Sequence, residues 1–298
     1  MKTKPFLFIL LFSFNLFFSQ KYILLDDLKS KFPVHEYTLD THELYDIKKD
    51  INVYNVFVSK STILLITVLP DLNEKVLPGL DERGKNWQII NFKDIKDRIL
   101  SNDQIRSIAT DWKISNVPEK KTLEYQLVKK ENETYYISKM CLTELFSIGS
   151  LKFPLTSSYG TINTSEQKVT IKEMEASFKN QFPNKDFIMD PTVNNKIRLM
   201  DELYTVRNYF SKEYLIKGDK AYQFWTFDGW WEHDGYNEYR GIDRFLYIPN
   251  KGIVGGSYDF YFRKNSERIT SNSSFTVSDF KLWGNIINER IMTAKELK

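Results

Sequence analysis

The sequence contains one cysteine, Cys141, in 298 residues. A single cysteine cannot form a disulfide within the chain, so packing and hydrogen bonds must supply the stability. Cys141 ends a strand-like run at residues 135–141, and we predict a buried structural thiol there rather than a reactive nucleophile. No cysteine closely follows the N-terminal apolar run, which argues against a lipid anchor.

Long hydrophobic runs are missing from most of the chain. The one exception is residues 6–18, which follow Lys2 and Lys4. A membrane-spanning helix needs about 20 apolar residues, whereas a short basic region followed by a short apolar run is the pattern of a secretory signal. We therefore predict a cleavable signal peptide at residues 1–20, a secreted or periplasmic product, and no stable membrane span after cleavage.

Neither sign of charge is in excess. The chain has 42 basic and 39 acidic residues, and removal of the two lysines of the signal leaves 40 basic residues against 39 acidic ones. Proteins that bind nucleic acids carry a basic face or cluster, whereas the basic runs here are pairs such as Lys48-Lys49 and Lys129-Lys130. We therefore predict no nucleic-acid partner.

Glycine-rich phosphate loops are missing as well. Gly252, Gly255 and Gly256 follow a turn and enter a strand-like run, so no helix N-terminus would face a bound phosphate. The run from Gly255 to Asp259 contains Ser257 but lacks the closing glycine of a nucleophile elbow. These absences predict no nucleotide, and we expect no other cofactor.

Histidine is scarce, with three in the chain. His35 and His42 each precede a glutamate, but they are seven residues apart, whereas the helical zinc motif needs a spacing of four. On a strand, an odd separation would place the two rings on opposite faces. The acidic residues between positions 228 and 238 do not follow the order of a calcium-binding loop. We predict no metal site.

Apolar residues alternate in some segments and recur at helical spacing in others, which predicts an α+β fold of antiparallel sheets with packed helices. The predicted helices cover residues 24–31, 92–99, 105–112, 170–178, the stripe Leu199, Leu203, Val206 and Phe210, and a C-terminal segment capped at Ser278. The predicted strands cover residues 53–58, 62–69, 123–129, 134–140, 221–231, 240–248 and 253–263.

A polar segment at residues 156–167 predicts a boundary near residue 160, which would separate an N-terminal domain, 21–160, from a C-terminal domain, 161–298. Phe32-Pro33 recurs as Phe182-Pro183 after a similar helical pattern, at an offset of 150. One hypothesis is that the two halves are related by duplication. The alternative is a recurrent way to end a helix, because proline cannot continue one.

Aromatic residues are abundant, and 14 of the 41 residues at positions 222–262 are Phe, Trp or Tyr, against 15% of the chain. Aromatic faces can stack on sugars and other planar ligands. The alternative is a sheet core, because Tyr258, Phe260 and Phe262 would share one face of a strand. Both interpretations stay open at this stage.

Within this region, residues 228–237 form the predicted exposed loop. We predict a ligand-binding site there, made of Trp225, Trp230, Trp231, Glu232, His233, Asp234 and Tyr236. The preferred function is non-enzymatic binding of a glycan, another envelope component or a protein partner by an exported protein.

Two alternatives remain open. His233 lies beside two carboxylates, a combination suited to general acid–base chemistry, so an extracytoplasmic hydrolase is the first alternative. Asp228 and Glu232 could likewise act as the carboxylate pair of a glycosidase. The second alternative is a structural or interaction protein without a small-molecule site. Burial of Trp225, Trp230 and Trp231 would favour this last alternative.

Overall fold

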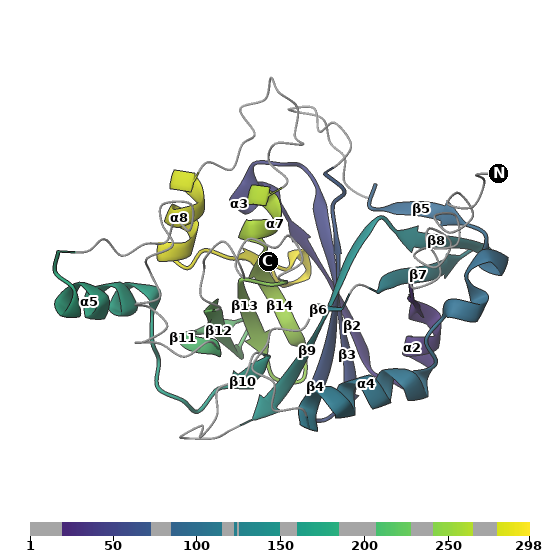
Figure 1. The fold of residues 1–298 in the computed structure, drawn as a ribbon, viewed down its shortest axis with the longest axis horizontal. Helices are drawn as coiled ribbons and strands as arrows, with labels where there is room; N and C mark the ends of the chain where they lie inside the picture. The colour runs from purple at the N-terminus through teal and green to yellow at the C-terminus, as the bar shows by residue number, and fades with distance from the viewer. Residues whose placement is uncertain are drawn as a thin grey trace, which may run out of the picture.

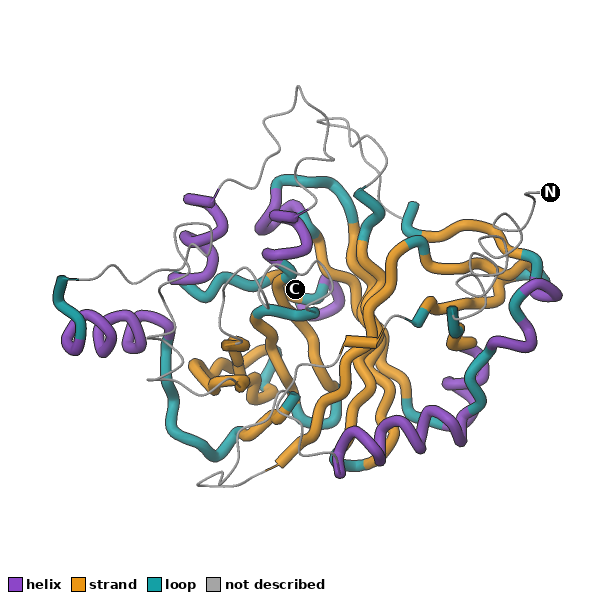
Figure 2. Tube along the Cα trace, viewed as in Figure 1, coloured by secondary structure: helices purple, strands orange, loops and turns teal. Residues whose placement is uncertain are grey.

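Three mostly antiparallel sheets dominate the fold (Figure 1). The structure is a computed structural model that describes the following residues: 20–72, 85–114, 122–123, 125–149, 160–184, 207–227, 241–264 and 279–298. Figure 2 shows strands running through the middle of the molecule, with helices on both sides of them. We call the three sheets the central, the small and the C-terminal sheet.

The central sheet separates the two other sheets (Figure 1). Its strand order is β10-β9-β4-β3-β2, and β6 (Thr122–Leu123) also pairs with β9. The strands are β2 (Val34–Asp40), β3 (Asp50–Ser59), β4 (Thr62–Leu69), β9 (Met140–Gly149) and β10 (Thr161–Asn163). All eight residues of β4 are buried, because both faces of this sheet are covered. The predictions of strands at 53–58 and 62–69 are confirmed.

The small sheet has the order β1-β7-β8-β5. Its strands are β1 (Tyr22–Leu24), β5 (Trp87–Ile90), β7 (Gln126–Glu131) and β8 (Thr134–Ser138). The strands predicted at 123–129 and 134–140 overlap β7 and β8, which form a hairpin. Its two turn residues, Asn132 and Glu133, both have positive φ, at 47° and 64°. Two consecutive positive φ values match the right-handed twist of the flanking strands.

The C-terminal sheet has the order β11-β12-β13-β14-β15. Its strands are β11 (Arg207–Ile216), β12 (Asp219–Phe227), β13 (Arg244–Ile248), β14 (Gly252–Ser257) and β15 (Met292–Thr293).

Two predictions in this sheet are wrong. Phe210, expected on a helix, lies in β11, where residues 208–211 are all buried and a register shift lies between Phe210 and Lys212. Continuous burial and the shift hide the alternation that marks a strand. The strand predicted to reach Arg263 ends at Ser257 and is followed by a helix. The alternating aromatics there fit a strand as well as a helix, because residues 258–262 are all buried and show no helical periodicity.

The helices are α2 (Leu25–Lys31), α3 (His42–Tyr45), α4 (Asn102–Ile114), α5 (Ile171–Gln181), α7 (Asp259–Lys264) and α8 (Asp279–Ile287). The short 3-10 turns are η1 (Phe92–Asp94), η2 (Lys96–Arg98) and η4 (Lys295–Leu297). The helix predicted at 92–99 is thus two short turns. The predicted cap at Ser278 lies outside the described residues.

Two helices begin with a reciprocal pair of hydrogen bonds between side chain and backbone. Ser101 accepts a hydrogen bond from Gln104 N at the start of α4, and the Gln104 side chain accepts one from Ser101 N. Thr170 and Glu173 form the same reciprocal pair at the start of α5. Each pair satisfies two of the N–H groups that a helix start leaves unpaired.

The largest core lies between the central and C-terminal sheets and contains side chains from both sides of residue 160. Phe146 and Phe245, for example, are in contact with ring centroids 5.2 Å apart. A second core lies on the other face of the central sheet, under α2, α4 and the small sheet. The central sheet therefore packs on both neighbours, and the division into two domains near residue 160 stays a prediction.

Three polar side chains of the central sheet also bind the C-terminal half. Asn55 accepts a hydrogen bond from Ile253 N at 2.6 Å and donates one to Ile253 O at 2.9 Å. The Thr67 and Tyr258 hydroxyls are 2.8 Å apart, and Glu144 accepts from Ile242 N. Buried polar groups need such partners, so these contacts fix how the two sheets pack.

Both Phe-Pro pairs, Phe32-Pro33 and Phe182-Pro183, directly follow the end of a helix. Phe32 N donates to Leu28 O after α2, and Phe182 N donates to Phe178 O after α5, each at 2.8 Å. Leu28 and Phe178 are both fully buried. The residues that would correspond to most of β2 lie outside the described part of the chain, so the duplication stays a hypothesis.

Candidate functional site

Trp225, the first residue of the predicted ligand site, is a core residue. It lies in β12, is fully buried, and stacks on Tyr209 with ring centroids 4.6 Å apart. Its indole N–H donates to Val169 O at 2.8 Å. Both its face and its polar group are therefore occupied within the protein, which corrects the expectation that this ring stacks on a ligand. Six other predicted site residues lie outside the described residues: Trp230, Trp231, Glu232, His233, Asp234 and Tyr236.

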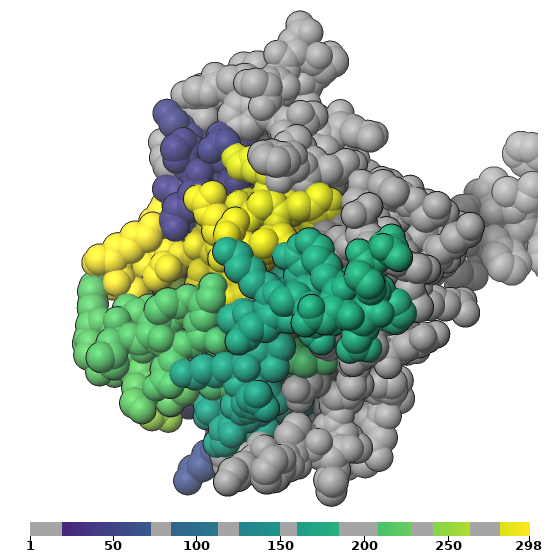
Figure 3. Space-filling model, turned by 90° about the vertical axis from the view of Figure 1, so that its left-hand side faces the viewer, coloured from purple at the N-terminus to yellow at the C-terminus, as the bar shows by residue number. Residues whose placement is uncertain are grey.

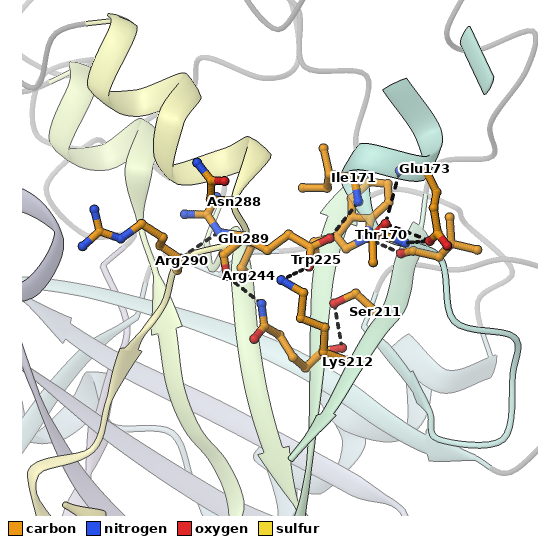
Figure 4. Close-up of polar contacts among 12 residues, drawn as sticks. Thr170, Ile171, Glu173, Ser211, Lys212, Trp225, Arg244, Asn288, Glu289 and Arg290 are labelled. Carbon is orange, nitrogen blue, oxygen red and sulfur yellow. Dashed lines mark hydrogen bonds and ion pairs between the residues drawn. The ribbon is translucent and has the colours of Figure 1, made fainter. Parts of the chain in front are cut away.

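A network of mostly buried polar side chains lies near Trp225, on the face of the C-terminal sheet covered by α5 and the segment after α8 (Figure 4). We call it the seam; it consists of Lys212, Gln223, Arg244, Asp259 and Glu289. Its first centre is Glu289, whose side chain is 1% exposed. Glu289 accepts a hydrogen bond from Ile171 N at 2.7 Å and pairs with Lys212 Nζ at 2.7 Å. Ile171 is the first residue of α5, where unpaired N–H groups and the helix dipole favour a carboxylate.

The second centre of the seam is an ion pair between Arg244 and Asp259. Arg244 Nη2 lies 2.5 Å from Asp259 Oδ2, and the two side chains are 2% and 0% exposed. Arg244 Nε donates to Arg290 O at 2.9 Å. Tyr45 from the N-terminal half donates its hydroxyl hydrogen to Asp259 Oδ1 at 3.2 Å and accepts from Tyr258 N at 2.7 Å. The pair therefore connects α3, β13, α7 and the C-terminal segment.

Burial governs the electrostatics of this second centre. It raises the pKa of Asp259 from 3.8 to about 6, because an anion is poorly solvated there and Asp243 is nearby, while Arg244 counteracts the rise. Burial likewise raises the pKa of Tyr45 well above 10. Perturbed pKa values are common in active sites, but buried ion pairs show them too.

The seam is suited to holding elements together. In Figure 3 the C-terminal segment lies against the β11–β12 hairpin and the region of α5, and Gln223 Nε2 donates to Glu289 O at 2.7 Å between them. The charged groups have opposite partners within the protein, and Arg244 and Asp259 are closed off from solvent. We therefore interpret the seam as structural, because Glu289, Arg244 and Asp259 are all closed off from solvent.

The exposed aromatic face is a different feature, which the sequence analysis did not single out. We define it as Trp87, Ile89, Lys129, Glu131 and Tyr136, all in the small sheet. Ile89 in β5 pairs with Tyr136 in β8, which pairs with Lys129 in β7. Paired residues of antiparallel strands project to the same side, and Trp87 and Glu131 join them two residues along their strands. Ile89 is 72% exposed, whereas Trp87 and Tyr136 are partly buried and Trp87 also packs against the second core.

Lys129 organises this face. Its Nζ lies 4.4 Å from the ring centroid of Trp87, 5.9 Å from that of Tyr136, and 2.7 Å from Glu131 Oε1. An ammonium over an aromatic ring is attracted by the negative ring face. The ion pair and the two ring contacts together restrict the rotamers of four side chains. The positions of the two rings are therefore restrained by contacts within the protein.

The aromatic face points toward an edge of the central sheet. Tyr54 in β3 pairs with Glu36 in β2, and Glu36 forms a 2.5 Å ion pair with Lys29. The pKa of Tyr54 is raised first by burial, then by the charges of Glu36 and, among others, Glu131. The charges of two carboxylates, one from the central sheet and one from the small sheet, therefore affect the Tyr54 hydroxyl. Glu36 forms an ion pair with Lys29 and Glu131 forms one with Lys129, so both carboxylates that raise the pKa of Tyr54 also have a lysine partner.

The histidines of the N-terminal half belong to separate elements. His35 lies in β2 and packs edge-on against Phe57, with ring centroids 5.5 Å apart, whereas His42 begins α3. Within the described ranges, no group of three or more His, Cys, Asp or Glu side chains is arranged to hold a metal ion. Among the same residues, no helix has both the length and the apolar character required to cross a membrane.

Comparison of the chain with known protein families, curated proteins and solved structures finds no match.

Cys141 provides a simple test of the core. Burial raises the pKa of its thiol from 9.0 to about 12, so the reactive thiolate should be roughly a thousandfold scarcer at pH 8 than for a free cysteine. We expect no reaction with Ellman's reagent in the folded protein and one equivalent in 6 M guanidinium chloride. Rapid labelling of the folded protein would contradict the burial of Cys141.

Proposed function

We propose that the protein is an exported, non-enzymatic binding protein that engages its ligand through the exposed aromatic face of the small sheet. The observation that carries the proposal is the joint exposure of Ile89 with two partly exposed rings, Trp87 and Tyr136, held by Lys129. We also propose secretion or periplasmic location after removal of residues 1–20, and an α+β fold with helices packed on two halves.

Two physical considerations support a ligand at this face: the free energy available from burying Ile89, and the small entropy loss of rings that are already ordered. An apolar side chain such as Ile89 that stays in water contributes little to folding, whereas burial by a ligand would contribute roughly 1.5–3 kcal/mol. Tryptophan and tyrosine are enriched at binding surfaces because they bury a large area and lose few rotamers. The contacts of Lys129 reduce that loss further, since the rings are already ordered. The segment from Trp230 to Tyr236 remains a second proposed contact.

A thermal-shift panel tests this proposal. The mature protein is screened with glycans, phospholipid vesicles and polypeptides, and each hit is repeated with Tyr136→Ala and Ile89→Ser. A ligand at 100 times its Kd adds about 2.7 kcal/mol to the free energy of unfolding, which corresponds to several degrees at this size. We expect both substitutions to remove the shift.

The matched control is Lys130→Ala. Lys130 follows Lys129 in β7, but its ammonium lies over Tyr135, on the opposite side of the sheet. It should leave the ligand-induced shift unchanged. If every hit keeps its full shift in Tyr136→Ala and Ile89→Ser, or if no compound produces a shift, the proposal is wrong.

A further inference from the structure

We infer that the ligand of the exposed aromatic face is a neutral, hydroxyl-rich glycan. This inference rests on the proposed function, because it names the ligand class of the same face. Three features support it: the balance of charge near Tyr54, the pairing of donors and acceptors, and the flat ring of Tyr136.

Charge balance argues against a charged ligand. The two ion pairs beside Tyr54 contribute two lysines and two glutamates, with Nζ–Oε1 distances of 2.5 Å for Lys29–Glu36 and 2.7 Å for Lys129–Glu131. An anionic ligand would approach a lysine but meet two carboxylates, and a cationic ligand would meet two ammonium groups. A neutral ligand meets neither repulsion and leaves both pairs intact.

Hydroxyl groups suit these pairs. Each hydroxyl has one hydrogen to donate and lone pairs to accept, so neighbouring hydroxyls of a sugar can donate to Glu131 and accept from Lys129 together. Hydrogen bonds to charged partners are stronger than those between neutral groups. Glu131 is 54% exposed and Lys129 is 22% exposed, so a ligand can reach both side chains.

The rings complete the match. A pyranose has one or two flat faces of C–H groups, and these pack on the aromatic faces of tryptophan and tyrosine. Tyr136 is the ring on which such a face would pack, because Trp87 already has the Lys129 ammonium 4.4 Å from its ring centroid and packs against the second core. An extended polypeptide would use the site differently, because it would pair with the backbone of β5 and depend little on Lys129 and Glu131.

Isothermal titration calorimetry with defined sugars tests the inference. The probes are neutral hexasaccharides of glucose, mannose and N-acetylglucosamine, with alginate and polygalacturonate as anionic probes and chitosan as a cationic one. We expect binding of at least one neutral probe, with a Kd that changes less than twofold between 50 and 500 mM NaCl, because no net charge is neutralised.

The variants separate stacking from hydrogen bonding. Tyr136→Ala should weaken the binding of the neutral probe at least tenfold, whereas Tyr136→Phe keeps the ring and should change Kd less than threefold. Glu131→Gln should weaken binding by about tenfold at an unchanged melting temperature, because Glu131 is exposed. Glu133→Gln is the matched control, since Glu133 lies in the turn of the same hairpin, and it should leave Kd unchanged.

Different failures have different meanings. If only a charged polysaccharide binds, with strong salt dependence and loss in Tyr136→Ala, the neutral-glycan inference is overturned and the proposed function stands. The same holds if a polypeptide binds through this face and no glycan does. If no probe binding depends on Tyr136 or Ile89, the inference and the proposed function both fail.

Discussion

Arg244→Met should lower the free energy of unfolding by about 3–5 kcal/mol at pH 8, which is the typical cost of breaking a buried ion pair from one side. The reason is that Asp259, which is 0% exposed, would lose its cationic partner and keep only the hydroxyl of Tyr45. Urea denaturation followed by circular dichroism measures the effect. A loss below 1 kcal/mol would mean that the pair is not closed off from water.

The pH dependence of this loss provides an independent check. The folded-state pKa of Asp259, about 6, lies above the ordinary value of 3.8. A carboxyl with a raised pKa contributes stability that is complete below its unfolded pKa and is lost as the pH rises through the folded one. Without Arg244 the folded pKa should rise further, so the difference between wild type and variant should be larger at pH 8 than at pH 5.

Two controls isolate the buried pair. Lys179→Ala removes the exposed pair with Glu175 in α5 and should cost about 0.5 kcal/mol or less. The double variant Arg244→Met, Asp259→Leu removes both charges and should recover part of the loss, because apolar residues of similar volume often replace buried pairs well. If the double variant were less stable than Arg244→Met alone, the unpaired carboxylate would not be the cause.

The elements that local pattern determines were predictable. The strands β3 and β4 follow from short apolar runs, and the starts of α4 and α5 follow from Ser101 and Thr170 as caps. The predictions failed where local pattern is ambiguous. The helix α7 is short and its residues 259–262 are all buried, so its aromatic residues fit a strand equally well.

The sites depend on contacts between distant parts of the chain. Tyr45 and Asp259 are 214 residues apart, and Ile171 and Glu289 are 118 residues apart. No local spacing in the sequence can therefore predict either contact. The aromatic face was partly within reach of sequence reasoning. A two-residue turn at 132–133 pairs residue 129 with 136, which places Lys129 beside Tyr136. The position of Trp87 follows only from the pairing of β5 with β8.

Trp225→Ala should produce the second large effect, a loss of about 3–5 kcal/mol in the free energy of unfolding. The substitution would leave a cavity in the main core, remove the stack on Tyr209, and leave Val169 O without the indole hydrogen bond. Trp225→Phe keeps a ring and should cost less, because the cavity is smaller. The matched control is Ile89→Ala, whose exposed side chain should contribute about 0.5 kcal/mol or less.

The same comparison decides between two roles for Trp225. A ring that stacks on a ligand would leave the unliganded melting temperature nearly unchanged when removed, and would change only ligand binding. A core ring has the opposite signature, and at roughly 2–4 °C per kcal/mol the melting temperature should fall by about 10 °C in Trp225→Ala. Differential scanning calorimetry of the unliganded variants measures this fall. An unchanged melting temperature would return Trp225 to the list of ligand-binding candidates and would contradict its burial.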